Sequence, residues 1–191
     1  MSRSLGILAE DATDIDVLKV IANRYKPGAF SFKVHHGRGA GELHRKGSRW
    51  IADLQRRDVR HVVILHDLDR DRGSGELHDE SDLRHRLRRV VADATLEHLL
   101  CIPVEELEAW FWSCPDVLAK VAGRPQRAHR NPHAIRGPKE QLVALSRRGG
   151  RRPHYSTNDN RELAGLLDLE RAARACPALR ELLAFLDLAG E

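Results

Sequence analysis

Cysteine is scarce in this chain of 191 residues. The three cysteines, Cys101, Cys114 and Cys176, are widely spaced and form no Cys-x-x-Cys pair, which excludes a disulfide framework and a cysteine-built zinc site. The 11 histidines likewise lack the His-Glu-x-x-His motif of zinc hydrolases. We therefore expect no zinc, and we expect the cysteines to be buried apolar side chains.

Long apolar runs are also missing. The longest aliphatic stretch is about as long as Val62–Leu65, whereas a membrane span needs roughly 20 apolar residues. The first residues contain no apolar core of the kind that a signal peptide has. These absences predict a cytoplasmic protein without a membrane partner.

The charges that the chain does contain are unevenly distributed. The apolar fraction of 41% is enough for a core, and the formal net charge is only +4. Residues 124–154, however, carry nine basic side chains against one acidic side chain, Glu140. Such a stretch attracts phosphates, although a solvated arginine-rich loop has the same composition. We predict that it contacts DNA or RNA through Arg124, Arg127, Arg130, Arg147, Arg148, Arg151 and Arg152.

The order of periodic segments predicts an α/β fold. Apolar runs at 4–9, 30–34, 61–65 and 96–104 are typical of strands, and amphipathic segments lie between them. This alternation predicts a parallel sheet of about four strands flanked by helices, with a further helix beginning at Glu105. After Gly123, prolines interrupt the chain and helical patterns follow at 139–147, 161–174 and 178–188. We predict an α/β domain over 1–123 and a basic, helical C-terminal annex over 124–191 packed on it.

Acidic residues follow two of the predicted strands. Glu10 comes directly after the first strand, and Asp67 and Asp69 follow the third. Because the carboxyl ends of parallel strands meet at one edge of a sheet, these side chains should converge there. Clustered carboxylates repel one another unless a cation joins them, and an all-oxygen ligand set selects Mg²⁺ or Mn²⁺. Turn residues and helix caps are the structural alternative, which two acidic strand ends together disfavour.

Two other motifs begin in the same way as the loop after the third strand. Asp67-x-Asp69-x-Asp71 opens like a calcium loop, but Arg72 stands at the sixth position, where glycine is required, and His78 at the twelfth, where glutamate is required. Haloacid-dehalogenase-type phosphatases place their Asp-x-Asp after the first strand, and the motif here follows the third. Both of these interpretations therefore fail.

The arrangement resembles the Toprim fold shared by topoisomerases, primases and OLD-family nucleases. The resemblance rests on residues 5–14 (Leu-Gly-Ile-Leu-Ala-Glu-Asp-Ala-Thr-Asp), on residues 62–69 (Val-Val-Ile-Leu-His-Asp-Leu-Asp) and on the α/β order between them. Residues 102–110 and Pro138-Lys139 look similar to small stand-alone Toprim-related proteins of unknown function, which are often encoded beside an ATPase. The chain has too few tyrosines and too little length for a topoisomerase, and too few cysteines for the zinc module of a primase. A nuclease-like Toprim protein remains.

Several further residues are candidates for the same site. Glu108 should lie near the end of the fourth strand, although capping of the helix also explains it. The resemblance implies that Lys139 reaches the scissile phosphate, while Arg70 and Arg72 either pair with Asp71 or hold phosphate. We therefore predict catalytic residues Glu10, Asp67, Asp69, Glu108 and Lys139, and metal ligands Glu10, Asp67, Asp69 and Asp71.

These observations predict a Mg²⁺- or Mn²⁺-dependent phosphodiesterase that acts on DNA or RNA. The resemblance implies a role as effector of an ATPase-coupled phage-defence system, and it leaves a homodimer open. One alternative is a non-catalytic Toprim-like protein that docks an ATPase through the aromatic segment Trp110–Trp112. A small-molecule phosphohydrolase is the other alternative, and it would need a closed pocket in place of an open basic surface.

Overall fold

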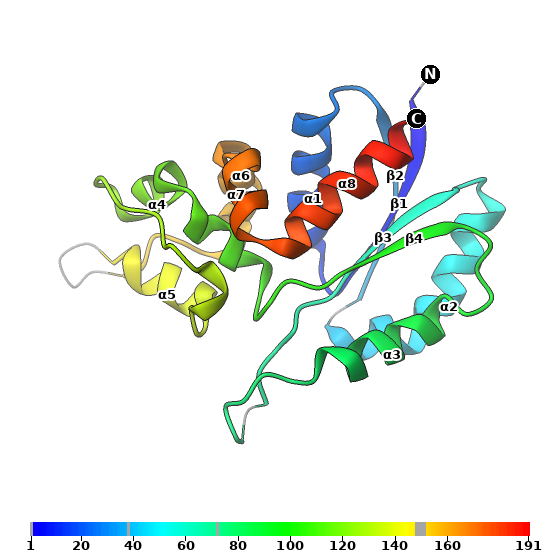
Figure 1. Cartoon of the computed structure of the whole chain (residues 1–191), viewed down its shortest axis with the longest axis horizontal. Helices are drawn as coiled ribbons and strands as arrows, with labels where there is room; N and C mark the ends of the chain where they lie inside the picture. The colour runs from blue at the N-terminus through cyan, green and yellow to red at the C-terminus, as the bar shows by residue number, and fades with distance from the viewer. Residues whose placement is uncertain (1, 38, 72, 148–151) are drawn as a thin grey trace.

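The computed structural model describes residues 2–37, 39–71, 73–147 and 152–191, and these form an α/β fold around one parallel sheet (Figure 1). The sheet has four strands in the order β2-β1-β3-β4, and every neighbouring pair is parallel. The strands are β1 (Arg3–Ala9), β2 (Phe30–His36), β3 (His61–Leu65) and β4 (Glu97–Cys101). The predicted fold class is confirmed.

The two central strands are apolar because both faces of the sheet are covered. Successive side chains of a strand point to opposite faces, so Ile7 of β1 and Val63 of β3 lie in one hydrophobic core while Leu8 and Ile64 lie in the other. The uninterrupted apolar runs of β1 and β3 thus supply both cores at once. Cys101, Cys114 and Cys176 are buried free thiols, as expected.

Helices cover the two faces in different ways (Figure 1). On one face lie α2 (Ala40–Arg56) and α3 (Glu80–Val90), and on the other lie α1 (Ala12–Tyr25) and the C-terminal helix α8 (Pro177–Gly190). The axes of α2 and α3 approach closely at Gly47, where a Cβ atom would lie 2.5 Å from Cγ1 of Val90. No helix in the described ranges is long and apolar enough to cross a membrane.

Short elements fill the chain between β4 and α8. They are the 3-10 helices η1 (Leu107–Ser113), η2 (Pro132–Ala134) and η3 (Thr157–Asp159), and the helices α4 (Pro115–Ala122), α5 (Pro138–Leu145), α6 (Asn160–Leu166) and α7 (Leu169–Ala175). The expected helix at Glu105 is instead a 3-10 helix that begins two residues later. The single helix expected over 161–174 is divided, because Asp168 caps a new helix by accepting a hydrogen bond from the Arg171 N–H at 3.0 Å.

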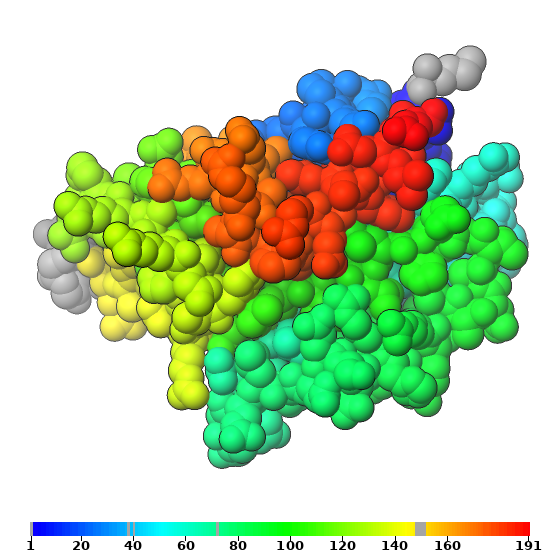
Figure 2. All heavy atoms as spheres, in the orientation of Figure 1, coloured from blue at the N-terminus to red at the C-terminus, as the bar shows by residue number. Residues whose placement is uncertain are grey.

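The C-terminal segment shares its hydrophobic core with the sheet. Leu182 and Leu186 of α8 belong to the same buried cluster as Leu5 and Ile7 of β1. Figure 2 shows the red atoms of α8 against the blue atoms of α1. The guanidinium of Arg24, near the end of α1, also donates to the carbonyl oxygens of Ala164 and Leu167, both at 2.7 Å. Residues after 123 are therefore joined to the sheet through α1 and α8.

Candidate functional site

The candidate site lies where β1, β3 and β4 end. Leu8 of β1 is paired with Ile64 of β3, and Leu65 is paired with Cys101 of β4, so the three strands end at one level. Beyond that level, the Leu68 N–H donates to the Pro103 carbonyl at 2.9 Å, and the Glu105 N–H donates to the Leu68 carbonyl at 3.1 Å. The loops after β3 and β4 therefore run side by side at the carboxyl edge of the sheet.

Asp67 is at the centre of a group of carboxylates that we call the acidic cluster: Glu10, Asp14, Asp67, Asp69 and Glu108. Burial raises the pKa of Asp67 well above its usual range, and the charges of Asp14, Glu108, Glu10 and Asp69 raise it further. One oxygen, Oδ1, accepts a hydrogen bond from the Leu107 N–H at 3.1 Å, which ties Asp67 to the start of η1. The predicted residues Glu10, Asp67, Asp69 and Glu108 are thus close enough to act on one another electrostatically.

Asp14 is the member of the cluster that the sequence reasoning did not select. It lies in the first turn of α1, where Asp11 is the cap and accepts a hydrogen bond from the Thr13 N–H at 2.7 Å. Burial raises the pKa of Asp14 to about 8, with contributions from the charges of Asp11, Glu108 and Glu10. The available signal was the spacing of Glu10 and Asp14, because they are four positions apart and the first turn of the helix follows the strand end directly.

One oxygen of Glu10 has no hydrogen bond. Its Oε1 is buried without a hydrogen-bond partner among the described residues, although it lies 2.8 Å from Nδ1 of His66. That ring nitrogen is also 2.8 Å from the Asp67 carbonyl oxygen, to which it donates. Burial lowers the pKa of His66, but Glu10 and the Asp67 carbonyl outweigh this effect and raise it. A carboxylate oxygen with an ion pair but no hydrogen bond therefore lies at the end of β1.

Asp69 and Lys139 form the solvent-facing side of the site. Asp69 is an exposed residue. Its pKa is raised, first because its carboxyl group is partly desolvated and then because Glu10 carries the same charge. The positive charges of His66 and Lys139 act in the opposite direction and lower it. Lys139, at the start of α5, binds Glu106 twice: Nζ lies 2.6 Å from Oε1, and the backbone N–H donates to Oε2 at 3.1 Å. The structure therefore brings Lys139 to the cluster, together with Glu106, which the sequence reasoning also missed.

Other predicted residues are placed elsewhere. Asp71 is exposed, and its Oδ1 accepts the N–H groups of Gly73 and Ser74 at 2.9 and 2.7 Å, so it is a turn residue that the structure does not bring into the cluster. Arg70 forms an ion pair with Glu105 and donates to the Gly75 carbonyl at 2.9 Å, which leaves it engaged within the chain.

The arginines of the basic segment are at the surface. In the part of the chain that the structure describes, all six members are exposed and form no ion pair: Arg124, Arg127, Arg130, Arg136, Arg147 and Arg152. Three further predicted residues, Arg72, Arg148 and Arg151, lie outside the described residues. The exposed arginines leave their guanidinium groups available to an anionic partner.

The chemistry of the acidic cluster fits a hard divalent cation, but its side chains are not gathered around one point. Carboxylate oxygens are the ligands that Mg²⁺ and Mn²⁺ prefer, and Oε1 of Glu10, which forms an ion pair with His66 but no hydrogen bond, is a ligand of that kind. Among the described residues, however, no group of three or more His, Cys, Asp or Glu side chains is positioned to hold a metal ion. A cation would therefore require these side chains to close around it.

The fold and the site together define an α/β protein with a parallel sheet and a carboxylate-rich edge. The chain belongs to the family described as a domain of unknown function, DUF4276, which matches residues 15–187. The matched range contains Asp67, Asp69, Glu108 and Lys139 and begins immediately after Asp14. Comparison with curated proteins found no match, and neither did comparison with solved structures.

Proposed function

We propose that this chain is a Mg²⁺- or Mn²⁺-dependent phosphodiesterase that cleaves DNA or RNA. One observation carries the proposal, namely that β1 and β3 end at one level, so that Glu10 and Asp67 meet at the carboxyl edge of the sheet, where the half-buried Asp67 feels the charges of four other carboxylates. Such an arrangement costs stability unless protons or a cation offset the charge. Catalytic sites commonly contain such repelling carboxylates, because a bound divalent ion offsets their repulsion.

In this proposal, Glu10, Asp67 and Asp69 hold the cation, which when bound neutralises charge on the phosphate and lowers the pKa of a water molecule. Glu10 is suited to accept the proton of the attacking water, because it ends β1 beside Asp67 and its Oε1 contacts only His66, in an ion pair, among the described residues. Lys139 adds a positive charge beside Asp69 and Glu108, where it favours an approaching phosphate. Asp71 has no role in this proposal.

The basic segment supports nucleic acid as the substrate. Its six described arginines are exposed and form no ion pair, so they are free to follow a phosphate backbone, and such contacts do not depend on base sequence. The Toprim resemblance points to the same reaction, and with it to an ATPase as a partner. That resemblance concerns the strand ends at Glu10 and Asp67, where the acidic cluster also lies.

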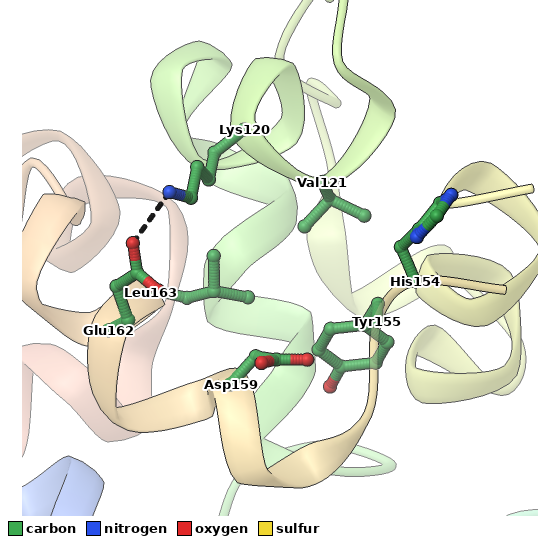
Figure 3. Close-up of a pocket in the computed structure, with 7 residues that line it drawn as sticks. All are labelled: Lys120, Val121, His154, Tyr155, Asp159, Glu162 and Leu163. Atoms are coloured by element: carbon green, nitrogen blue, oxygen red, sulfur yellow. Dashed lines mark ion pairs between the residues drawn. The ribbon is translucent and has the colours of Figure 1, made fainter. Parts of the chain in front are cut away.

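A non-catalytic partner protein is the second candidate, because the cluster is not gathered into a preformed metal site. Its docking element would not be Trp110 or Phe111, which are buried in the core of this chain, whereas Trp112 of the same segment is half-buried. A small-molecule phosphohydrolase has less support. The cavity in Figure 3, of about 210 Å³, is lined by residues such as Lys120, His154 and Glu162, and none of its lining residues belongs to the acidic cluster.

The test is cleavage of end-labelled single- and double-stranded DNA and RNA by the full chain, with Mg²⁺, with Mn²⁺ and with a chelator. We expect metal-dependent cleavage by the unchanged chain and a loss of at least about a hundredfold in Asp67→Asn. Asp71→Asn removes the same charge from the same loop and should cleave normally. The proposal is wrong if the unchanged chain cleaves none of these substrates, or if Asp67→Asn cleaves them as well as Asp71→Asn does.

A further inference from the structure

A buried chain of polar side chains connects the C-terminal segment to the acidic cluster. The Tyr155 hydroxyl donates to Oδ1 of Asn160 at 2.8 Å, and Nδ2 of Asn160 donates to Oε1 of Glu108 at 2.9 Å. Exposed fractions are 6% for Tyr155, 0% for Asn160 and 4% for Glu108. Water is therefore not available to replace these hydrogen bonds.

The direction of each hydrogen bond follows from the chemistry of the groups. An amide has one accepting end and one donating end, and the Tyr155 hydroxyl occupies the accepting end of Asn160. The donating end must then face Glu108, and a donated N–H favours the ionised form of a carboxyl group. The pKa of Glu108 is raised overall, because burial raises it more than the Asn160 hydrogen bond lowers it.

These hydrogen bonds end on Glu108, which is a carboxylate of the candidate site. Glu108 is one of the charges that raise the pKa of both Asp14 and Asp67, so its charge acts on the cluster. Asn160 begins α6, which contributes nothing else to the acidic cluster, and the ring of Tyr155 lines the separate cavity shown in Figure 3. The two residues thus reach the acidic cluster through Glu108.

We propose that Asn160 and Tyr155 are positioning residues, which hold the carboxyl group of Glu108 in place at the acidic cluster so that it contributes to binding of the divalent cation. This inference rests on the proposed function. It adds that the C-terminal segment is required for cation binding, and not only for contact with nucleic acid. Neither residue touches the cation or the substrate, and both act through Glu108 alone.

The test measures Mn²⁺ binding by calorimetry, together with the electron paramagnetic resonance signal of free Mn²⁺, on the full chain without substrate. We expect Asn160→Ala to weaken Mn²⁺ binding about tenfold, as is typical when a group that orients a metal ligand is lost. Tyr155→Phe should weaken it less, because Asn160 stays but its amide is no longer held. Tyr25→Phe is the matched control, since it removes a similar 2.9 Å hydrogen bond to the carboxylate of Asp187, on α8, and should leave binding unchanged.

A double-mutant cycle separates positioning from a general effect on the fold. In a Glu108→Gln background, Asn160→Ala should weaken Mn²⁺ binding no further, because its route to the cation is already lost. An equal loss in both backgrounds, or no loss in the Glu108 background, would overturn the inference while leaving the proposed function intact. If Asn160→Ala does not fold, Mn²⁺ binding by Tyr155→Phe is compared in the Glu108 and Glu108→Gln backgrounds, and the same two outcomes support or overturn the inference. Failure of the unchanged chain to bind Mn²⁺ overturns both proposals.

Discussion

At the scale of the residue, Asp14 offers the clearest measurable consequence of the acidic cluster. Its folded-state pKa of about 8 lies above the usual 3.8, so the folded chain binds more protons than the unfolded chain between these values. The free energy of unfolding should therefore fall as pH rises from about 4 to 8. Asp14→Asn removes this cost, and we expect it to stabilise the metal-free chain by roughly 1–3 kcal/mol at pH 8 and by little at pH 4.

Urea unfolding of both chains at pH 4, 6 and 8, in the presence of a chelator, measures this difference. Asp16→Asn is the control, because it changes the same residue type on the same helix at a position that is paired with Lys19. Equal stabilisation by Asp14→Asn at all three pH values would mean that helix propensity is responsible. It would contradict electrostatic repulsion between Asp14 and the carboxylates of Glu10 and Glu108.

The residue scale also shows how far the sequence could predict the site. Glu10, Asp67 and Asp69 could be selected because they follow apolar strands directly, and the ends of parallel strands must meet. Asp14 could not be separated from a helix-capping acid, because an acidic residue in the first turn is stabilised there in any helix. Asn160 had no signal at all, since it is 52 positions from its partner Glu108 and only the packing of α6 brings them together.

At the scale of the element, two glycines in helices should respond in opposite directions. A Cβ at Gly47 of α2 would meet Cγ1 of Val90 at 2.5 Å, and the β-branched valine cannot easily move away. Gly47→Ala should therefore destabilise the chain by about 1–3 kcal/mol.

A Cβ atom added at Gly165 of α6 would have no atom within 4 Å, so Gly165→Ala should stabilise the chain by about 0.5–1 kcal/mol. Thermal unfolding of the two variants checks both signs, and stabilisation by Gly47→Ala would contradict the close packing of α2 on α3.

Element by element, the strands could be predicted better than the segment after β4. Apolar runs identify β1 and β3 because both faces of these strands are buried, which is a property of the residues themselves. The 3-10 helix η1 depends on partners far along the chain. Asp67 binds the N–H of Leu107, Arg70 pairs with Glu105, and Glu105 adopts a φ of 64°, which only such contacts can maintain. A local pattern contains none of this information.

At the scale of the whole molecule, charge and core are arranged differently along the chain. The hydrophobic core includes α8 as well as the sheet, so residues after 123 cannot be detached without exposing apolar side chains of β1 and α1. Basic side chains with almost no acidic neighbours are instead found over residues 124–154, the segment that also supplies Lys139 to the site and that is followed closely by Asn160. One segment therefore combines the expected contact with phosphate with the support of the acidic cluster.

This arrangement predicts how nucleic-acid binding depends on salt. Each phosphate contact lowers the slope of log K against log salt by about 0.9 on duplex DNA, and slightly less on single strands. Replacing Arg124, Arg127 and Arg130 with serine should flatten the slope by about two to three, to a similar extent on unrelated sequences. The control replaces Arg88, Arg171 and Arg180, three exposed arginines of α3, α7 and α8, which changes the net charge equally. Fluorescence anisotropy at several salt concentrations measures both, and equal slopes for the two variants would show that net charge alone, and not the basic segment, attracts the nucleic acid.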